Sequence, residues 1–298
     1  MMSSEPQMFG ALSPNMFDQM ILAITSRLPD NWLGLRLAIL LRRAVTMRLG
    51  YPAGALDVER WGMRLRLHPR DNGCEKNLLF TPRMYEPIEL RELSAEIARA
   101  KQDGRTFTFV DIGANVGLFS IFAAAEAGQN ARILAIEPEP GNLSRLDFNL
   151  RANPNAPIRV VATALSDEAG NLAIEVDRRD RGGTHTKKQA QDTALAHASL
   201  VPSQTLLGVL AAENFETIDA LKIDVEGFED VILHPFFREA PSRLWPRMII
   251  IEDSRANWKA DLMATLLQNG YKMPVRSKQN FILRRAADRE PAAVNRAS

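Results

Sequence analysis

Hydrophobic positions along the chain repeat with two different periods, and the change between them marks the expected elements. Residues 15–28 and 31–49 place apolar side chains at helical intervals, which predicts two N-terminal helices. Between residues 63 and 67 apolar and polar side chains alternate, as in a half-buried strand, and residues 55–60 are the expected partner strand. A further helix is expected over residues 87–104, where the pattern ends at a glycine.

Strand and helix patterns then alternate, which is typical of a parallel sheet with helices on both faces. The expected strands are 106–111, 132–137, 158–163, 220–225 and 247–252, with helices at 116–128, 141–153 and 260–270. Residues 171–177 are typical of an added strand, and 271–275 with 281–285 of a terminal hairpin. The fold class predicted from this pattern is α/β, with an N-terminal helical extension and a small β-hairpin.

Two segments lack such periodicity. Residues 178–199 have little apolar content, which predicts a long loop that acts as a mobile lid. The polar tail is expected to be disordered. The predicted organisation is a helical extension over 1–54, a β-hairpin and linker over 55–83, a main domain over 84–285, and a tail over 286–298.

Composition narrows the class of protein. Hydrophobic residues make up 46% of the 298 positions and charged residues 24%, which is close to the average of soluble globular proteins. The net charge of +1 gives no general attraction to nucleic acid, so no nucleic-acid partner is expected. Cys74 is the sole cysteine, which excludes an internal disulfide and a cysteine-built zinc site. No signal peptide is recognisable, and a cytoplasmic location is expected.

The N-terminal helices leave two interpretations open. Residues 33–45, LGLRLAILLRRAV, are expected to form an amphipathic helix with a basic edge. Such a helix can pack on the main domain, or it can lie on a membrane surface as a peripheral contact. No run reaches the roughly 20 apolar residues that a spanning helix needs.

The stretch FVDIGANVGLF, residues 109–119, places a tight turn between a buried strand and a helix. Dinucleotide-binding turns have glycines at the first, third and sixth positions, but Asn115 stands at the third position here. An NAD-linked oxidoreductase is therefore disfavoured. The pattern suits S-adenosylmethionine: Asp111 can bind the ammonium group, and N–H groups after Asn115 can bind the carboxylate. Gly113 allows a close approach and Gly117 tight packing; a plain structural turn is the alternative.

Acidic residues also follow the next two strands. Glu137 ends the second strand, 20 residues beyond Gly117, where a carboxylate can accept both ribose hydroxyls. Its alternative role is to cap the next helix. Ser166 and Asp167 follow the third strand, and Asp167 can accept the adenine amino group or be a simple turn residue.

The fourth strand, within LKIDVEGFED, alternates apolar residues with Lys222, Asp224 and Glu226. If the strand persists, these three charged side chains point to one side. Buried charges are costly unless paired, so the array is expected to line a reaction centre. A Lys222–Glu226 ion pair that fastens the strand end is the structural alternative.

These blocks, together with ALSDEAGNL, IIIE and the closing NFILRR, resemble the FkbM-type S-adenosylmethionine-dependent methyltransferases over residues 84–285. The resemblance implies a Rossmann-like, seven-stranded class I methyltransferase sheet. It also implies O-methylation of hydroxyl groups on natural products or cell-surface sugars, so a small-molecule or glycan acceptor is the expected partner. By motif, the cofactor would contact Asp111, Gly113, Asn115, Gly117, Glu137, Ser166 and Asp167, and Lys222, Asp224 and Glu226 would lie at the reaction centre. Members often have Thr-Leu-Asp-Asp where this chain has Thr205 to Gly208, TLLG.

Asp224 is the first candidate for the general base, with Glu226, His185 or His197 next. Hard oxygen ligands on Asp224, Glu226, Glu252 and Asp253 would also suit magnesium, although a metal-free reaction is expected. A rival from another class is a non-catalytic cofactor-binding or scaffold protein of a glycan-assembly complex. The acids at Asp111, Glu137 and Asp224 count against it, because a decayed site would lose them without harm.

Overall fold

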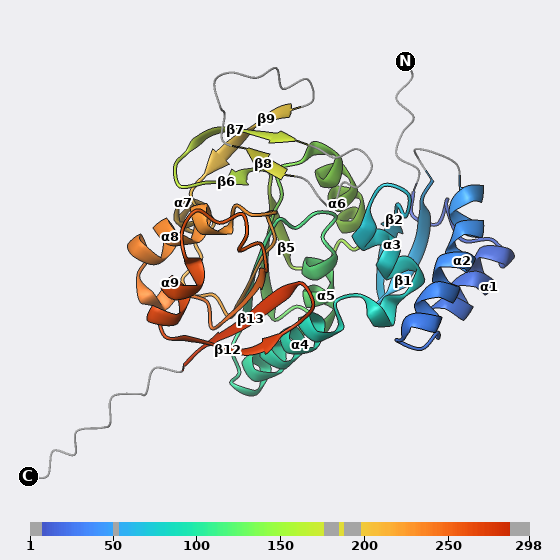
Figure 1. Cartoon of the computed structure of the whole chain (residues 1–298), viewed down its shortest axis with the longest axis horizontal. Coiled ribbons are helices and arrows are strands. Elements are labelled where there is room, and N and C mark those ends of the chain that lie inside the picture. The colour runs from blue at the N-terminus through green and yellow to red at the C-terminus, as the bar shows by residue number, and fades with distance from the viewer. Residues whose placement is uncertain (1–7, 50–53, 176–184, 188–197, 287–298) are drawn as a thin grey trace, which may run out of the picture.

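The computed structural model describes residues 8–49, 54–175, 185–187 and 198–286. At its centre is a seven-stranded sheet in the order β12-β13-β11-β10-β3-β4-β5 (Figure 1). The strands are β3 (Phe107–Ile112), β4 (Ala131–Ile136), β5 (Ile158–Val161), β10 (Ala220–Ile223), β11 (Met248–Glu252), β12 (Tyr271–Arg276) and β13 (Asn280–Arg285). Neighbours from β5 to β11 pair in parallel, and β13 is antiparallel to both its neighbours. The predicted fold class, an α/β chain with a mostly parallel seven-stranded sheet, is confirmed.

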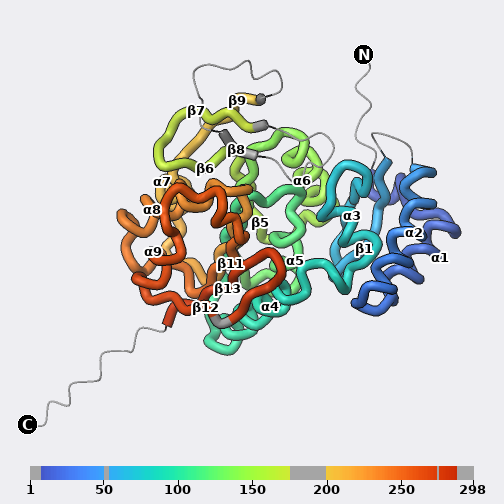
Figure 2. The backbone as a smooth tube through the Cα atoms, in the orientation of Figure 1, coloured from blue at the N-terminus to red at the C-terminus, as the bar shows by residue number. Residues whose placement is uncertain are grey.

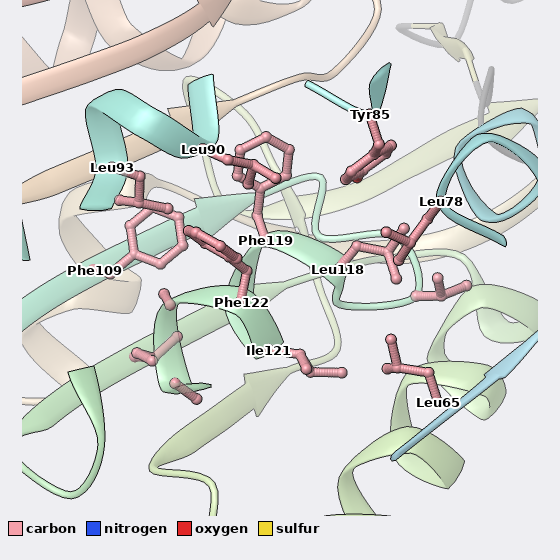
Figure 3. Packing of buried hydrophobic residues seen from close by; sticks show 14 of the residues in the cluster. Leu65, Leu78, Tyr85, Leu90, Leu93, Phe109, Leu118, Phe119, Ile121 and Phe122 are labelled. Atoms are coloured by element: carbon pink, nitrogen blue, oxygen red, sulfur yellow. The ribbon is translucent and has the colours of Figure 1, made fainter. Parts of the chain in front are cut away.

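Helices cover both faces of this sheet, as predicted. On one face lie α4 (Pro87–Gln102), α5 (Leu118–Ala127) and α6 (Pro140–Ala152); on the other lie α7 (Leu206–Ala212), α8 (Glu229–Glu239) and α9 (Leu262–Gln268). Figure 3 shows the core on the face that α4 and α5 cover. There Phe109 of β3 and the α5 residues Phe119 and Phe122 pack with Leu90 and Leu93 of α4. The sequence pattern did not predict α7 or α8, and Pro235 interrupts the apolar repeat of α8.

The pleat of β3 determines to which face of the sheet Asp111 points. Phe107 and Phe109 pack into the core on the α5 side, whereas Val110 and Ile112 belong to the core on the opposite side. Because side chains alternate along a strand, Asp111 points to the α5 side. Lys222 of β10 is in register with Asp111, so the lysine and the aspartate lie side by side on the same face.

A second sheet, in the order β6-β9-β7-β8, lies beside the carboxyl edge of the main one. Its strands are β6 (Ala164–Leu165), β7 (Gly170–Glu175), β8 (His185–Lys187) and β9 (Ala198–Gln204). The predicted added strand is thus confirmed as β7. Within the predicted lid, residues 185–187 and 198–199 are strand and not loop, because they pair with β7. The rest of 178–199 lies outside the described residues.

The N-terminal part begins with α1 (Met16–Thr25) and α2 (Trp32–Arg48), which lie side by side at one end of the molecule (Figure 2). The predicted hairpin follows as β1 (Leu56–Arg60) and β2 (Met63–Leu67). Two further short helices, α3 (Gly73–Phe80) and η1 (Pro82–Met84), lead into α4. Among the described residues, no helix has both the length and the apolar character needed to cross a membrane. The tail beyond residue 286 lies outside the described residues.

Candidate active site

A pocket opens at the carboxyl ends of β3, β4 and β10, where ligands of open α/β sheets bind. Seven of the ten predicted site residues line it: Asp111, Gly113, Asn115, Glu137, Lys222, Asp224 and Glu226. Parallel strands bring their carboxyl ends to one edge, so residues more than 100 positions apart meet here. The structure therefore brings seven of the ten predicted residues together, and their roles toward a cofactor or an acceptor stay predictions.

Asp111 is 1% exposed and lies on the floor of the pocket. Its Oδ2 atom accepts hydrogen bonds from the backbone N–H and the hydroxyl of Ser120, at 3.1 and 2.7 Å. Its Oδ1 atom has no hydrogen-bond partner among the described residues, although it is buried. Burial raises the pKa of Asp111, while the neighbouring Lys222 charge lowers it. A buried oxygen without a partner is costly, so this atom fits a cationic ligand group.

The backbone conformation and close packing of the turn after Asp111 explain why two of its residues are glycines. Gly113 has a φ of +73°, and a Cβ atom there would lie 2.0 Å from the carbonyl oxygen of Asp224. Gly117 has a φ of +84°, and its Cβ would lie 2.3 Å from a methyl group of Leu146 in α6. Gly113 therefore permits close packing of the β3 and β10 ends, and Gly117 close packing on α6. Gly117 is not part of the pocket lining.

Asn115 and Glu137 connect the first two strand ends. Asn115 has a φ of +54°, and its N–H donates to Glu137 Oε2 at 2.7 Å. The other carboxylate oxygen of Glu137 accepts from the N–H of Glu139 at 2.9 Å. Burial raises the pKa of Glu137 to about 7, although these hydrogen bonds act in the opposite direction and lower it. Helix α6 is capped by Glu139 instead, so the alternative capping role of Glu137 is corrected.

Ser166 and Asp167 do not line this pocket. The Ser166 hydroxyl is buried and donates to Asp167 Oδ1 at 2.9 Å, whereas Asp167 itself is exposed. A smaller hollow next to the pocket is lined by Thr163, Ala164 and Leu165, directly before Ser166. The assignment of Asp167 to the adenine group stays a prediction.

On the fourth strand, Lys222 forms an ion pair, but not with Glu226, the partner expected if the pair only fastened the strand end. Lys222 Nζ donates to Asp224 Oδ2 at 2.9 Å, so the lysine pairs with Asp224 instead of fastening Glu226. Regular strand β10 ends at Ile223, and Glu226 has a φ of +56°, so the expected alternation of three charges does not persist. Burial lowers the pKa of Lys222, but the charges of Asp224 and Asp111 outweigh it and raise this pKa above its usual value.

Three acids gather where the strand ends face solvent. Asp224, Glu226 and Glu252 each place one carboxylate oxygen within 4.8 Å of the others, which is a spacing that a divalent cation could bridge. Asp253 is not part of this group, because its carboxylate binds Arg255 and Arg276. Burial, followed by the charge of Asp224, raises the pKa of Glu252 to about 7.

Eleven of the pocket-lining residues were not predicted, among them Tyr85, Glu86 and Asn280. Glu86 has a φ of +42°, precedes α4, and accepts a hydrogen bond from Asn280 Nδ2 at 3.2 Å. Burial, followed by the charge of Glu89, raises the pKa of Glu86 to about 7. Tyr85 is 5% exposed, and burial raises the pKa of its hydroxyl. The Glu-Pro pair before the helix is a start signal, but it gave no sign that the acid faces a pocket.

Two other candidates have no described side-chain position. His185 belongs to strand β8 by its backbone, and His197 lies outside the described residues. In the TLLG segment, Thr205 caps α7 and Leu206 is 1% exposed in the core. That segment therefore begins a helix instead of supplying acids to the pocket.

A family of known proteins matches this chain by sequence. The family profile described as the methyltransferase FkbM domain matches residues 111–273, more than half of the chain. No curated protein matches.

Solved structures give weak matches. A precorrin-6y C5,15-methyltransferase from Geobacter metallireducens GS-15 has 14% identity and a TM-score of 0.38, covering 65% of this chain and 85% of that one. The N-terminal domain of human METTL16 in complex with SAH has 16% identity and a TM-score of 0.39, covering 65% and 67%. The bifunctional kinase-methyltransferase WbdD has 14% identity and a TM-score of 0.43, and the match covers 70% of this chain and 41% of that one.

Proposed function

This chain belongs to the FkbM methyltransferase family, and we propose that it transfers a methyl group from S-adenosylmethionine to a hydroxyl oxygen of a sugar, glycan or natural product. One observation carries the proposal: a single pocket contains Glu137, the Lys222–Asp224 pair and the buried Asp111, one oxygen of which has no partner in the described part of the chain. The first two suit a cofactor with an ammonium group and a ribose, and the third suits a hydroxyl acceptor.

The cofactor half of the pocket, defined by Asp111, Asn115 and Glu137, fits S-adenosylmethionine by its chemistry. The Oδ1 atom of Asp111 would accept the ammonium group and thereby gain a partner that the described residues do not supply. Glu137 Oε2 accepts only the Asn115 N–H among the described residues and can also accept one ribose hydroxyl. Glu137 Oε1 accepts from the Glu139 N–H and, at 3.5 Å, from Asn142 Nδ2, and the second ribose hydroxyl would replace this longer bond. When bound, the cofactor supplies a methyl group on a positively charged sulfur.

The acceptor half is defined by four residues of the pocket lining and by Glu252, which lies beside them; the four are Glu86, Lys222, Asp224 and Glu226. Asp224 would take the proton of the acceptor hydroxyl, because its side chain is 37% exposed and lies at the pocket wall. Lys222 fixes one of its oxygens, which leaves the other for the acceptor. A positioned base of this kind contributes roughly 10² to 10⁴ in rate, and orientation of the acceptor adds to it.

The acceptor class is supported by the polar groups near Asp224. Three further carboxyl groups, those of Glu86, Glu226 and Glu252, lie close to it and can accept hydrogen bonds from several hydroxyls at once. Asn280 adds an amide at the same pocket. A molecule with several neighbouring hydroxyl groups, such as a sugar, fits this set better than an apolar acceptor does.

Titration calorimetry followed by a transfer assay tests the proposal. We expect S-adenosylmethionine and its demethylated product to bind and NAD to show no measurable heat. Radiolabelled methyl should then pass to a sugar or glycan extract and become base-stable, as expected for an ether. Binding without transfer to any hydroxyl acceptor would favour the scaffold protein, and binding of NAD alone would overturn the cofactor assignment.

A further inference from the structure

Exposed apolar side chains are concentrated on the two N-terminal helices, at one end of the molecule (Figure 1). Ten of the fourteen large hydrophobic residues that are exposed among the described residues belong to α1 or α2; the other four are Met8, Leu200, Leu267 and Met273. The ten are Met16, Phe17, Met20, Ile24, Trp32, Leu33, Leu35, Leu37, Leu40 and Met47. We call these the outer face of the N-terminal helices. Clusters of this kind on a protein surface mark interaction sites.

Helix α2 exposes large apolar side chains, which an ordinary surface helix would bury. Its buried residues are small or medium in size, namely Gly34, Ala38 and Val45. Six of its large apolar residues are exposed instead, with Trp32 68% and Leu40 61% exposed, while Ile39 and Leu41 are half-buried. A surface helix normally buries its apolar stripe and exposes a polar one. The exposed stripe of α2 is therefore not explained by packing within this chain.

The charged residues around the outer face are mainly positive, although Asp30 is also exposed. Residues 15–49 contain five arginines and two aspartates, a net charge of +3, whereas the whole chain has +1. Of the two aspartates, Asp18 is buried and paired with Arg48. Arg36 and Arg43 are exposed, and the Arg36 guanidinium lies 5.0 Å from the centre of the Trp32 ring. The combination of tryptophan, leucine and arginine is typical of helices that lie in a membrane interface.

We propose that the outer face of α1 and α2 docks this protein on an anionic lipid bilayer. The apolar side chains would enter the region between headgroups and acyl chains, and the arginines would meet the negative headgroups. A second copy of the chain is a poorer occupant, because two such faces would bring their arginines together. The helices lie at one end of the molecule, so a bilayer can reach them without contact with the main sheet (Figure 1).

Sedimentation with lipid vesicles tests this proposal on the full chain. Vesicles that contain phosphatidylglycerol in phosphatidylcholine should carry the protein down, and pure phosphatidylcholine vesicles should bind it far more weakly. Raising the salt to about 0.5 M should weaken binding, because it screens the arginines. Trp32 should report insertion by a blue shift of fluorescence that is lost in Trp32→Phe.

Matched variants separate the face from the rest of the surface. Leu40→Glu should weaken vesicle binding on the order of tenfold or more, since a leucine is withdrawn from the apolar region and a negative charge is added. Leu267→Glu, at a leucine that is 53% exposed on α9, should bind as the unaltered chain does. The double change Arg36→Glu with Arg43→Glu should also weaken binding on the order of tenfold, unlike Arg151→Glu with Arg238→Glu at other exposed sites.

The proposal is overturned by two results. One is equal binding to neutral and anionic vesicles by all variants. The other is a dimer in sedimentation velocity that Leu40→Glu dissociates without any loss of vesicle binding, which would make the face a contact between copies. Melting temperatures of the variants establish that each one is folded, and S-adenosylmethionine binding should be the same in all of them. Docking and the proposed transfer can thus fail independently.

Discussion

The two halves of the pocket hold their acids in different ways. In the cofactor half, backbone N–H groups contribute to fixing both carboxylates: Ser120 donates to Asp111, and Asn115 and Glu139 donate to Glu137. The Ser120 hydroxyl and the Asn142 amide add side-chain bonds. In the acceptor half, the donors to Asp224, Glu252 and Glu86 are side chains. Lys222 binds Asp224, the Ser254 hydroxyl binds Glu252, and the Asn280 amide binds Glu86. Both halves nevertheless occupy one sheet edge.

This contrast has a chemical meaning. Backbone donors move only with the strands and turns, so they hold an acid in one place, which suits a cofactor that has the same structure in every turnover. Side-chain donors can rotate away, so the acids they hold can exchange partners and protons. We infer that the chain keeps its cofactor side rigid and its acceptor side adjustable. Each prediction below separates the two sides.

The largest effect is expected from Asp224→Asn, which keeps the shape of the side chain and removes the proton acceptor. Turnover should fall by roughly 10² to 10⁴, the range of a general base. Affinity for S-adenosylmethionine should change little, because Asp111 and Glu137 lie on other strands. Single-turnover rates and calorimetry measure the two quantities. Asp147→Asn, an exposed acid on α6, is the control. Near-normal turnover by folded Asp224→Asn would move the search to Glu226 and Glu86.

Glu137→Ala should act on the opposite half. It removes hydrogen bonds to a charged group, worth about 1.5 to 3 kcal/mol, and should weaken S-adenosylmethionine binding roughly tenfold to a hundredfold. Turnover at saturating cofactor should stay closer to normal than in Asp224→Asn. Calorimetry of this variant beside Glu126→Ala, an exposed acid on α5, provides the measurement. Unchanged affinity would place the ribose elsewhere.

A smaller effect concerns stability and pH. Burial raises the pKa of Glu137 to about 7, above the value near 4.5 of an exposed carboxyl, so the folded state binds more protons between these two pH values. The contribution of Glu137 to stability therefore falls as the pH rises from 4.5 to 7. Glu137→Gln lacks this penalty, so its melting temperature relative to the unaltered chain should rise between pH 5 and pH 8. A difference in melting temperature that stays constant with pH would contradict the raised pKa of Glu137.

The smallest effect is expected from a chelator. If Asp224 acts as a base and no metal takes part, EDTA should change turnover by less than about twofold, since removing a cation leaves the base in place. A large loss that Mg²⁺ restores would instead show that Asp224, Glu226 and Glu252 hold a cation. Glu252→Gln distinguishes these cases again, because it should abolish any rescue by Mg²⁺ while leaving cofactor binding intact.

Part of the cofactor half could be located from sequence, although Gly117, Ser166 and Asp167, assigned to the same cofactor, do not line the pocket. An apolar run that ends in an acid gave the positions of Asp111 and Glu137, and the alternation of strands with helices gave a parallel sheet. Carboxyl ends of neighbouring parallel strands must meet, so no knowledge of distant contacts was needed to place both acids in one pocket. The glycine spacing was informative because positive φ angles at Gly113 and Gly117 restrict the residue type locally.

The sequence by itself thus determined the elements and the acids at their ends, because periodicity and turn preferences depend on near neighbours. Only the tertiary structure decided which side chains meet. Glu86 and Asn280 are 194 positions apart and touch because β13, which lies between β12 and β11, contacts α4. Lys222 pairs with Asp224 and not with Glu226, because the strand ends at Ile223 and the backbone turns at Glu226. Such contacts follow from strand order and local backbone geometry, which residue patterns do not encode.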